Sequence, residues 1–315
     1  MIAADLFDIG LAALVVSVAA FAVLARDTYS AVVAFVAYGL LVSLRWVLLH
    51  AVDVALTEAA IGSGLTGMLM LGAAARLRGT GGAPEPPPPS ARVRALAAVC
   101  GATVTAGLVG AVLSFPDPAP TLAAPATEAL PATGLGNPVT AVLIAYRATD
   151  TLLEKVVLVL SLVGVWSLAP DVGWSGRPRL LHPFADDGVL RFFARTLAPV
   201  GLLFGLHLMW NGADEPGGAF QGATVLAAMW LLVLMAGLAE APRIRARWLR
   251  VAVVAGPATF LAVGLAGLVL AGAFLAYPEP YAKSLILFVE LPMMLTIALV
   301  LALLVAGPPE PVAGP

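Results

Sequence analysis

Long apolar runs alternate with short polar connections along most of the chain. A membrane-spanning helix needs about 20 mainly apolar residues. About nine runs reach or approach that length: 6–25, 30–49, 53–75, 93–114, 151–168, 189–210, 219–239, 251–275 and 285–306. Two connections, 78–92 and 115–138, are rich in proline, which cannot continue a helix because its ring nitrogen carries no hydrogen to donate. The pattern predicts an all-α polytopic membrane protein with about nine transmembrane helices.

Composition agrees with this class and narrows the function. Hydrophobic residues make up 61% of the 315 residues and charged residues 11%, with a mean hydropathy of +0.98, whereas soluble domains carry about 25% charged residues. Cys100 is the only cysteine, so the chain can form neither an internal disulfide nor a Cys-x-x-Cys metal site. The sequence contains no hydrolase, zinc-protease or nucleotide-binding motif. We therefore expect no enzymatic activity, no cofactor, no metal ion and no nucleic-acid partner.

Arginines fall on alternate connections between the apolar runs. They are Arg26, then Arg76, Arg78, Arg92 and Arg94, then Arg177, Arg179, Arg191 and Arg195, then Arg243, Arg245, Arg247 and Arg250. The connections between these groups hold Lys283 as their one basic residue. Basic residues gather on the cytoplasmic side of a membrane, so the sorting predicts an N-terminus outside and a C-terminus in the cytoplasm. The acidic start MIAADLFDIG lacks the basic region of a signal peptide, so we expect the first span to be retained.

Two carboxylates interrupt the third apolar run, in the stretch VDVALTEAAIGSGLTGMLML. A carboxylate at the centre of a span costs about 2.5–3.5 kcal/mol, so Asp53 and Glu58 are candidates for an ion path. The alternative is structural, with Arg45 of the preceding helix holding Asp53 and Glu58 left unexplained. Gly62 and Gly64 follow, and they allow either close helix contact or a local bulge in the helix.

A second polar cluster lies in NPVTAVLIAYRATDTLLEKVVLVLSLVGVWSL, residues 137–168. One helix of this length would extend about 48 Å, more than the ~30 Å core of a bilayer, so we expect its first part to lie along the outer surface. Arg147, Asp150 and Glu154 share one helix face, as suits a proton or cation relay. Equally, Thr151 and Glu154 have the spacing of a capping box, which would only start the helix.

The sixth and seventh runs are joined by HLMWNGADEPGGAFQGATVLAA, residues 207–228. Its motif residues are Pro216, Gly217, Gly218, Phe220, Gln221 and Gly222. The Pro-Gly-Gly sequence favours a tight reversal, and the glycine four residues later lets the next helix begin against a neighbour. We favour a structural turn without ion chemistry.

Glu290 lies a few residues inside the last apolar run, in LFVELPMM. A glutamate within a span, with no basic residue beside it, is a functional candidate. A structural role is an equal alternative.

Three motifs resemble segments of one family. The stretch around Asp53 resembles the PDVALTE motif of MbhD-like segments, found in the large Mrp antiporter subunit and in membrane-bound hydrogenases. NPVTAVLIAYRATDTLLEKVVL resembles the MbhE-like segment that follows it. LRFFARTLAPVGLLFGLHLMWNGADEPGGAFQGATVLAA is similar to MnhB/MrpB and its PGGGFQGG signature. In this order the segments contribute three, two and four helices, in agreement with the apolar runs.

The resemblance implies a fused membrane subunit of an Mrp-like monovalent cation/proton antiporter complex in a bacterial cytoplasmic membrane, carrying Na⁺ or H⁺. Its segments would be 1–80 (MbhD-like), 81–170 (MbhE-like) and 185–310 (MnhB-like). The expected partners are a large antiporter-like subunit, small membrane subunits and the lipid bilayer. By motif position, ion-translocation roles fall on Asp53, Thr57, Glu58, Arg147, Asp150 and Glu154. Two alternatives stay open: a membrane-arm subunit of a redox-driven complex (an energy-converting hydrogenase or a complex I-like assembly), and a purely structural subunit.

Overall fold

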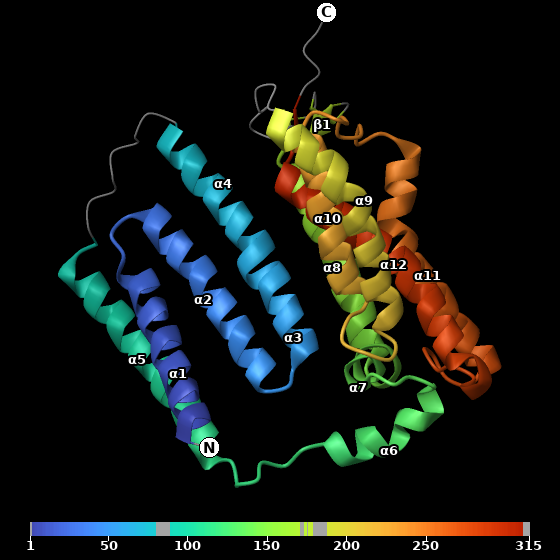
Figure 1. Cartoon of the computed structure of the whole chain (residues 1–315), viewed down its shortest axis with the longest axis horizontal. Helices are drawn as coiled ribbons and strands as arrows, with labels where there is room; N and C mark the ends of the chain where they lie inside the picture. Colours follow the sequence, from blue (N-terminus) through green and yellow to red (C-terminus); the bar gives the residue numbers. More distant parts are fainter. Residues whose placement is uncertain (1, 80–88, 171–172, 175, 179–187, 311–315) are drawn as a thin grey trace, which may run out of the picture.

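The fold is a set of long helices with connections gathered at two ends (Figure 1). A computed structural model describes residues 2–79, 89–170, 173–174, 176–178 and 188–310. The helices are α1 (Ile2–Leu24), α2 (Thr28–Leu48), α3 (Val52–Thr57), η1 (Glu58–Leu65), α4 (Thr66–Gly79), α5 (Ala91–Ser114), α6 (Ala123–Thr133), α7 (Pro138–Thr140), η2 (Ala141–Tyr146), α8 (Ala148–Ser167), α9 (Gly188–Asn211), α10 (Ala219–Met235), α11 (Arg247–Leu270), η4 (Glu279–Tyr281) and α12 (Ala282–Ala306). Two short strands, β1 (Arg177–Pro178) and β2 (Pro309–Glu310), pair antiparallel.

Within these described residues, seven helical spans are long and apolar enough to cross a membrane, and α10 is a shorter apolar helix. The 20-residue α8 carries Asp150, Glu154 and Lys155. The predicted class is confirmed: the protein is a helical multi-pass membrane protein. The arginine-bearing connections, such as α1–α2 and α10–α11, lie at one end of the molecule (Figure 1). The number of spans and the orientation in the membrane stay predictions.

The third helix runs without interruption through α3, η1 and α4, and its middle, Glu58–Leu65, is π-helical. π-Helical turns are frequent at functional sites. Both interpretations of the glycines in this region hold. The helix contains the local bulge, and it also approaches α2 closely, because a Cβ on Gly67 would lie 2.5 Å from Val36 Cγ2.

Residues 138–167 form α7, η2 and α8, with a break at Arg147, whose φ of −126° is not helical. Asn137 begins this run: its side chain accepts the N–H of Val139, and Pro138 occupies the first helical position, where no N–H is needed. Thr151 lies inside α8, and its hydroxyl donates to Leu143 O at 2.6 Å. The predicted capping box at Thr151 is therefore wrong, because the helix has already begun three residues earlier.

The C-terminal helices form the main core around α12. This helix packs against α10, α11 and α8, and most of its residues are buried. α9 and α10 form a hairpin through the reversal at 212–218. Its apolar residues pack with those of η2 and α8, so the second and third segments share one hydrophobic core. The first segment meets this core chiefly where α3 and η1 touch α10.

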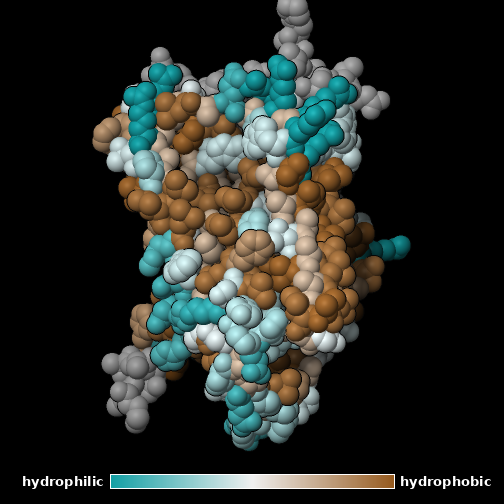
Figure 2. Space-filling view, turned by 90° about the vertical axis from the view of Figure 1, so that its right-hand side faces the viewer, coloured by the Kyte–Doolittle hydropathy of each residue, from teal (hydrophilic) through white to brown (hydrophobic). Residues whose placement is uncertain are grey.

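The outer surface suits a lipid or protein environment. Figure 2 shows a broad hydrophobic band between two more polar ends. α5 has no buried residue along its 24 positions. Large apolar side chains are exposed along the first segment and α9 as well, for example Val23, Leu24 and Leu203. Such an apolar exterior is stable only when it is covered by lipid or by neighbouring subunits.

Candidate functional site

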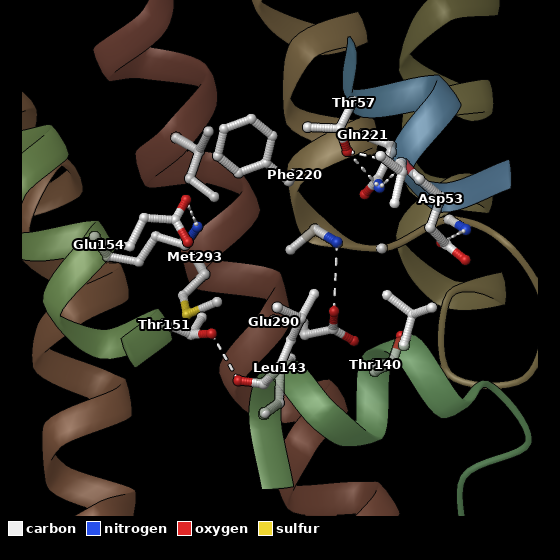
Figure 3. A pocket seen from close by; sticks show the side chains of 18 residues that line it. Asp53, Thr57, Thr140, Leu143, Thr151, Glu154, Phe220, Gln221, Glu290 and Met293 are labelled. Atoms are coloured by element: carbon white, nitrogen blue, oxygen red, sulfur yellow. Dashed lines mark hydrogen bonds and ion pairs between the residues drawn. The ribbon is translucent and has the colours of Figure 1, made fainter. Parts of the chain in front are cut away.

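A cavity of about 330 Å³ lies where the three segments meet, and we call it the junction cavity. Its wall comes from α3, α7, η2, α8, the start of α10 and the middle of α12 (Figure 3). Of the predicted site residues, it brings together Asp53, Thr57, Glu154, Gly217, Gly218, Phe220, Gln221 and Glu290. Residues separated by more than 200 positions in the sequence thus share one polar space inside a largely apolar wall.

Asp53 connects three parts of the chain. Its Oδ1 accepts the backbone N–H of Gly217 at 2.8 Å, and its Oδ2 accepts the side-chain amide of Asn137 at 3.4 Å. The carboxylate is buried, and both of its oxygens have donors. Arg45 forms an ion pair with Asp8 of α1 at 2.7 Å, so the predicted Arg45–Asp53 pair is wrong. Similar depth in the membrane did not place the two side chains on facing surfaces.

Gln221, in the first turn of α10, reaches across to α3. Its Nε2 donates to Thr57 Oγ1 at 3.2 Å and to Asp53 O at 3.4 Å. Its carbonyl oxygen faces Gly218, where a Cβ would lie 3.3 Å from it. The amide group therefore has donors directed at α3 and its oxygen directed at the glycine turn.

The reversal before α10 depends on glycine because the chain passes very close to α9. Gly218 donates its N–H to Leu208 O at 2.8 Å, and a Cβ on Gly217 would lie 2.5 Å from the same oxygen. One turn later, a Cβ on Gly222 would lie 2.5 Å from Gly205 O. The motif glycines thus let the turn fold back and let α10 pack directly on the backbone of α9.

Lys155 is a buried cation that the sequence analysis did not place among the site residues. It is 4% exposed. Its Nζ pairs with Glu154 Oε1 at 2.8 Å and lies 4.5 Å from the ring centroid of Phe220. The Glu154 side chain is 51% exposed, so the ion pair extends from the cavity to the surface of the chain. The signal in the sequence was a lysine beside a glutamate within an apolar run.

Glu290 is the most poorly compensated carboxylate of the junction cavity. It is 2% exposed, and its Oε1 accepts the N–H of Ala219 at 3.3 Å. Its Oε2 is buried without a hydrogen-bond partner among the described residues. Tyr277, just before η4, also has a buried hydroxyl without a partner there. Burial raises the pKa of Tyr277, and the charge of Glu290 raises that pKa further.

Several predicted residues lie outside the junction cavity. Arg147 and Asp150 pair with each other and are exposed. Glu58 lies over Gly62 and near Gly39 of α2, so its carboxylate is directed between α2 and η1. The other predicted residues that do not line the cavity are Gly64, Pro216 and Gly222. The proposed relay along one face of α8 is therefore split, with Glu154 in the cavity wall and the other two members on the surface.

Metal coordination finds no matching side chains: no three His, Cys, Asp or Glu residues gather as ligands in the part of the chain that the structure describes.

Two family models match the chain on either side of the cavity. One, described as "Domain related to MnhB subunit of Na+/H+ antiporter", matches residues 189–308. The other, MbhD, describes an MBH component and matches residues 13–79. The MbhE-like resemblance of residues 137–168 lies between these two matches and stays a prediction.

Solved structures give the same picture. A chain of the Mrp complex from Dietzia sp. DQ12-45-1b is 26% identical with a TM-score of 0.72, over 97% of this chain and 35% of that chain. The membrane-bound sulfane sulfur reductase (MBS), an archaeal respiratory membrane complex, has a chain that is 23% identical with a TM-score of 0.54, over 67% of this chain and 96% of that one. At this lower identity, the likeness shows the fold alone.

A curated relative, the uncharacterized protein MJ1307 of Methanocaldococcus jannaschii, is 27% identical over 154 residues. The match covers 44% of this chain and 59% of the relative. The chain thus spans about a third of the Mrp chain and less than two thirds of the curated relative.

Fold, cavity and matches together define the class: a membrane-arm subunit of a multisubunit complex, with a transporter-type role. More narrowly, the chain is a subunit of the Mrp/Mbh type, carrying an MbhD region and an MnhB-related region, so the resemblance found in the motifs is confirmed.

Proposed function

We propose that this protein is a membrane subunit of an Mrp-like monovalent cation/proton antiporter complex in a bacterial cytoplasmic membrane, and that an ion, Na⁺ or H⁺, passes through its carboxylates. Its three segments are 1–80, 81–170 and 185–310. A large antiporter-like subunit and small membrane subunits complete the complex. The match to a chain of an Mrp complex and the MnhB-related region support this assignment.

The junction cavity is the observation on which the proposal depends. It gathers Asp53, Glu154 and Glu290, one from each segment, with Lys155 beside them. Ionisable side chains at membrane depth are costly and are retained mainly along ion or proton pathways. Asp53 and Glu154 each have a compensating partner, whereas Glu290 has a single 3.3 Å hydrogen bond. An ion that enters the cavity would meet an uncompensated acid.

Glu154 connects the cavity with the outside of the chain. Its half-exposed carboxylate holds Lys155, and the exposed Arg147–Asp150 pair lies one turn away on the same helix. We infer that this face of α8 meets a partner subunit, which supplies the continuation of the path. Glu58, between α2 and η1, is a separate stop on the proposed path rather than part of the cavity.

A structural role is favoured for one residue. Asp53 is fully engaged with Gly217 and Asn137, and such a buried, hydrogen-bonded carboxylate ties segments together without binding an ion. We therefore assign Asp53 to holding the cavity together, and the ion path to Glu154 and Glu290.

Transport by the assembled complex tests the proposal. In proteoliposomes of the complete complex, addition of Na⁺ should dissipate an imposed proton gradient, measured with a pH-sensitive dye. Glu154→Gln should abolish this exchange while the complex still elutes as one species, because only the charge is removed. Glu279→Gln, an exposed glutamate outside the cavity, serves as the matched control.

Wild-type exchange rates in the Glu154→Gln complex would refute the ion path. Loss of the complex in that variant would favour the purely structural alternative. Co-purification of iron–sulfur or nickel subunits would select the redox-driven alternative.

A further inference from the structure

The uncompensated oxygen of Glu290 and the carbonyl oxygen of Gln221 converge on one small space. A Cβ placed on Gly218 would lie 3.3 Å from Gln221 Oε1 and 3.7 Å from Glu290 Oε1. Both oxygens therefore surround a point that is vacant because residue 218 is glycine. Figure 3 shows the Glu290 carboxylate beside the turn that leads into α10, in the cavity wall.

The charges around this space are unbalanced. Lys155 is engaged with Glu154 and the ring of Phe220, and Asp53 is engaged with two N–H donors. The amide group of Gln221 directs its N–H donors to Thr57 and Asp53, which leaves its oxygen facing the cavity. The remaining negative charge is that of Glu290, whose Oε2 has no partner among the described residues.

A buried carboxylate in this state must take up a proton or a cation, because an unpaired buried charge costs several kcal/mol. Two facts favour a cation. Two acceptor oxygens from different side chains face one space, and hard monovalent cations bind such oxygen ligands. A protonated Glu290 would need one acceptor for its single hydrogen and would leave the Gln221 oxygen unused.

We propose that Glu290, Gln221 and the vacancy at Gly218 form a binding site for a partly hydrated Na⁺ ion. The site lies at the positive N-terminus of α10, which lowers its affinity and so favours release as well as binding. This inference rests on the proposed function, since it identifies where the transported ion stops. It makes Gly218 necessary for more than its backbone, because a methyl group there would occupy the ion's position.

Thermal unfolding of the detergent-solubilised complete complex tests the site without transport. A ligand that binds only the folded state raises the melting temperature in proportion to its occupancy. We expect NaCl to raise the wild-type melting temperature relative to choline chloride at equal ionic strength. In Glu290→Gln the Na⁺-dependent shift should vanish, while in Glu279→Gln it should equal that of the wild type.

Gln221→Met provides a second variant that retains both length and the carboxylate, and it should weaken the Na⁺ response at least tenfold in concentration. If Glu290→Gln fails to assemble, this variant decides the question. An unchanged Na⁺ response in either variant overturns the site, as does a wild-type melting temperature that follows pH and ignores Na⁺.

The two proposals fail separately. Na⁺/H⁺ exchange in the wild-type proteoliposomes together with a Na⁺ response independent of Glu290 would remove the site and leave the function. A Glu290-dependent Na⁺ shift without any exchange would retain the site and remove the antiporter assignment.

Discussion

The carboxylate of Asp53 accepts the backbone N–H of Gly217 at 2.8 Å, across 164 positions of sequence. This bond joins the MbhD region to the MnhB-related region at the edge of the junction cavity. The bond is charge-assisted and buried, and such bonds contribute about 1.5–3 kcal/mol to stability. The geometry of the cavity therefore depends on a residue that itself has no free acceptor for an ion.

Asp53→Asn should destabilise the complex by about 1.5–3 kcal/mol, because the amide group presents an N–H donor where the carboxylate accepted one. Thermal unfolding in detergent measures this loss. Asp214→Asn is the matched control, since Asp214 pairs with Lys283 in an exposed position and surface pairs contribute about 0–1 kcal/mol. Equal losses in the two variants would contradict the role of Asp53.

Lys155 and Phe220 should be energetically coupled by about 0.5–2 kcal/mol, the range for cation–π contacts that are partly desolvated. The single variants Lys155→Met and Phe220→Leu and their double mutant form a cycle that isolates this coupling. We also expect Lys155→Met to keep much of its stability, because replacement of a buried ion by an apolar side chain of similar length is often neutral. A coupling energy of zero in the unfolding measurements would show that the 4.5 Å contact has no energetic weight.

Gly222→Ala should separate α9 from α10. The added Cβ would lie 2.5 Å from Gly205 O, which is backbone and cannot rotate away. We expect a loss of about 1–3 kcal/mol, as for other overpacked positions. Gly101→Ala in α5 is the control, because no atom lies within 4 Å of its added Cβ. Differential scanning fluorimetry of both variants would reveal the difference, and equal melting temperatures would count against the close packing.

Tyr277→Phe should leave stability at neutral pH unchanged or slightly higher, because the buried hydroxyl has no partner to lose among the described residues. The pKa of Tyr277 is raised by burial and by Glu290. A raised pKa in the folded state means that the folded form binds more protons than the unfolded form, so stability falls as pH rises above about 10. Unfolding measured at pH 8 and pH 11 should show a smaller fall in the Phe variant. A fall of the same size in both proteins would exclude the contribution of Tyr277.

The fold class could be predicted from the sequence because the length of an apolar run is a local property. The cavity could not, because it depends on which helix faces meet. Asp53 and Glu58 look like a pair in sequence, yet five residues at 3.6 per turn place them about 140° apart on the helix. Accordingly, Asp53 faces the MnhB-related region and Glu58 faces α2. Lys155 was missed for the same reason, since its contact with Phe220 exists only after α8 and α10 pack.

Gly62→Ala tests whether Glu58 is a separate stop on the ion path. A Cβ at residue 62 would collide with the carboxylate of Glu58, and this side chain can rotate away at little cost. We therefore expect a change in stability of less than about 1 kcal/mol, within the range of ordinary substitutions. If the path passes Glu58, displacement of its carboxylate should slow Na⁺/H⁺ exchange in proteoliposomes several-fold. Gly72→Ala, where nothing lies within 4 Å of the added Cβ, should exchange at the wild-type rate. Should Gly62→Ala match that control in both rate and stability, the path must run through the junction cavity without Glu58.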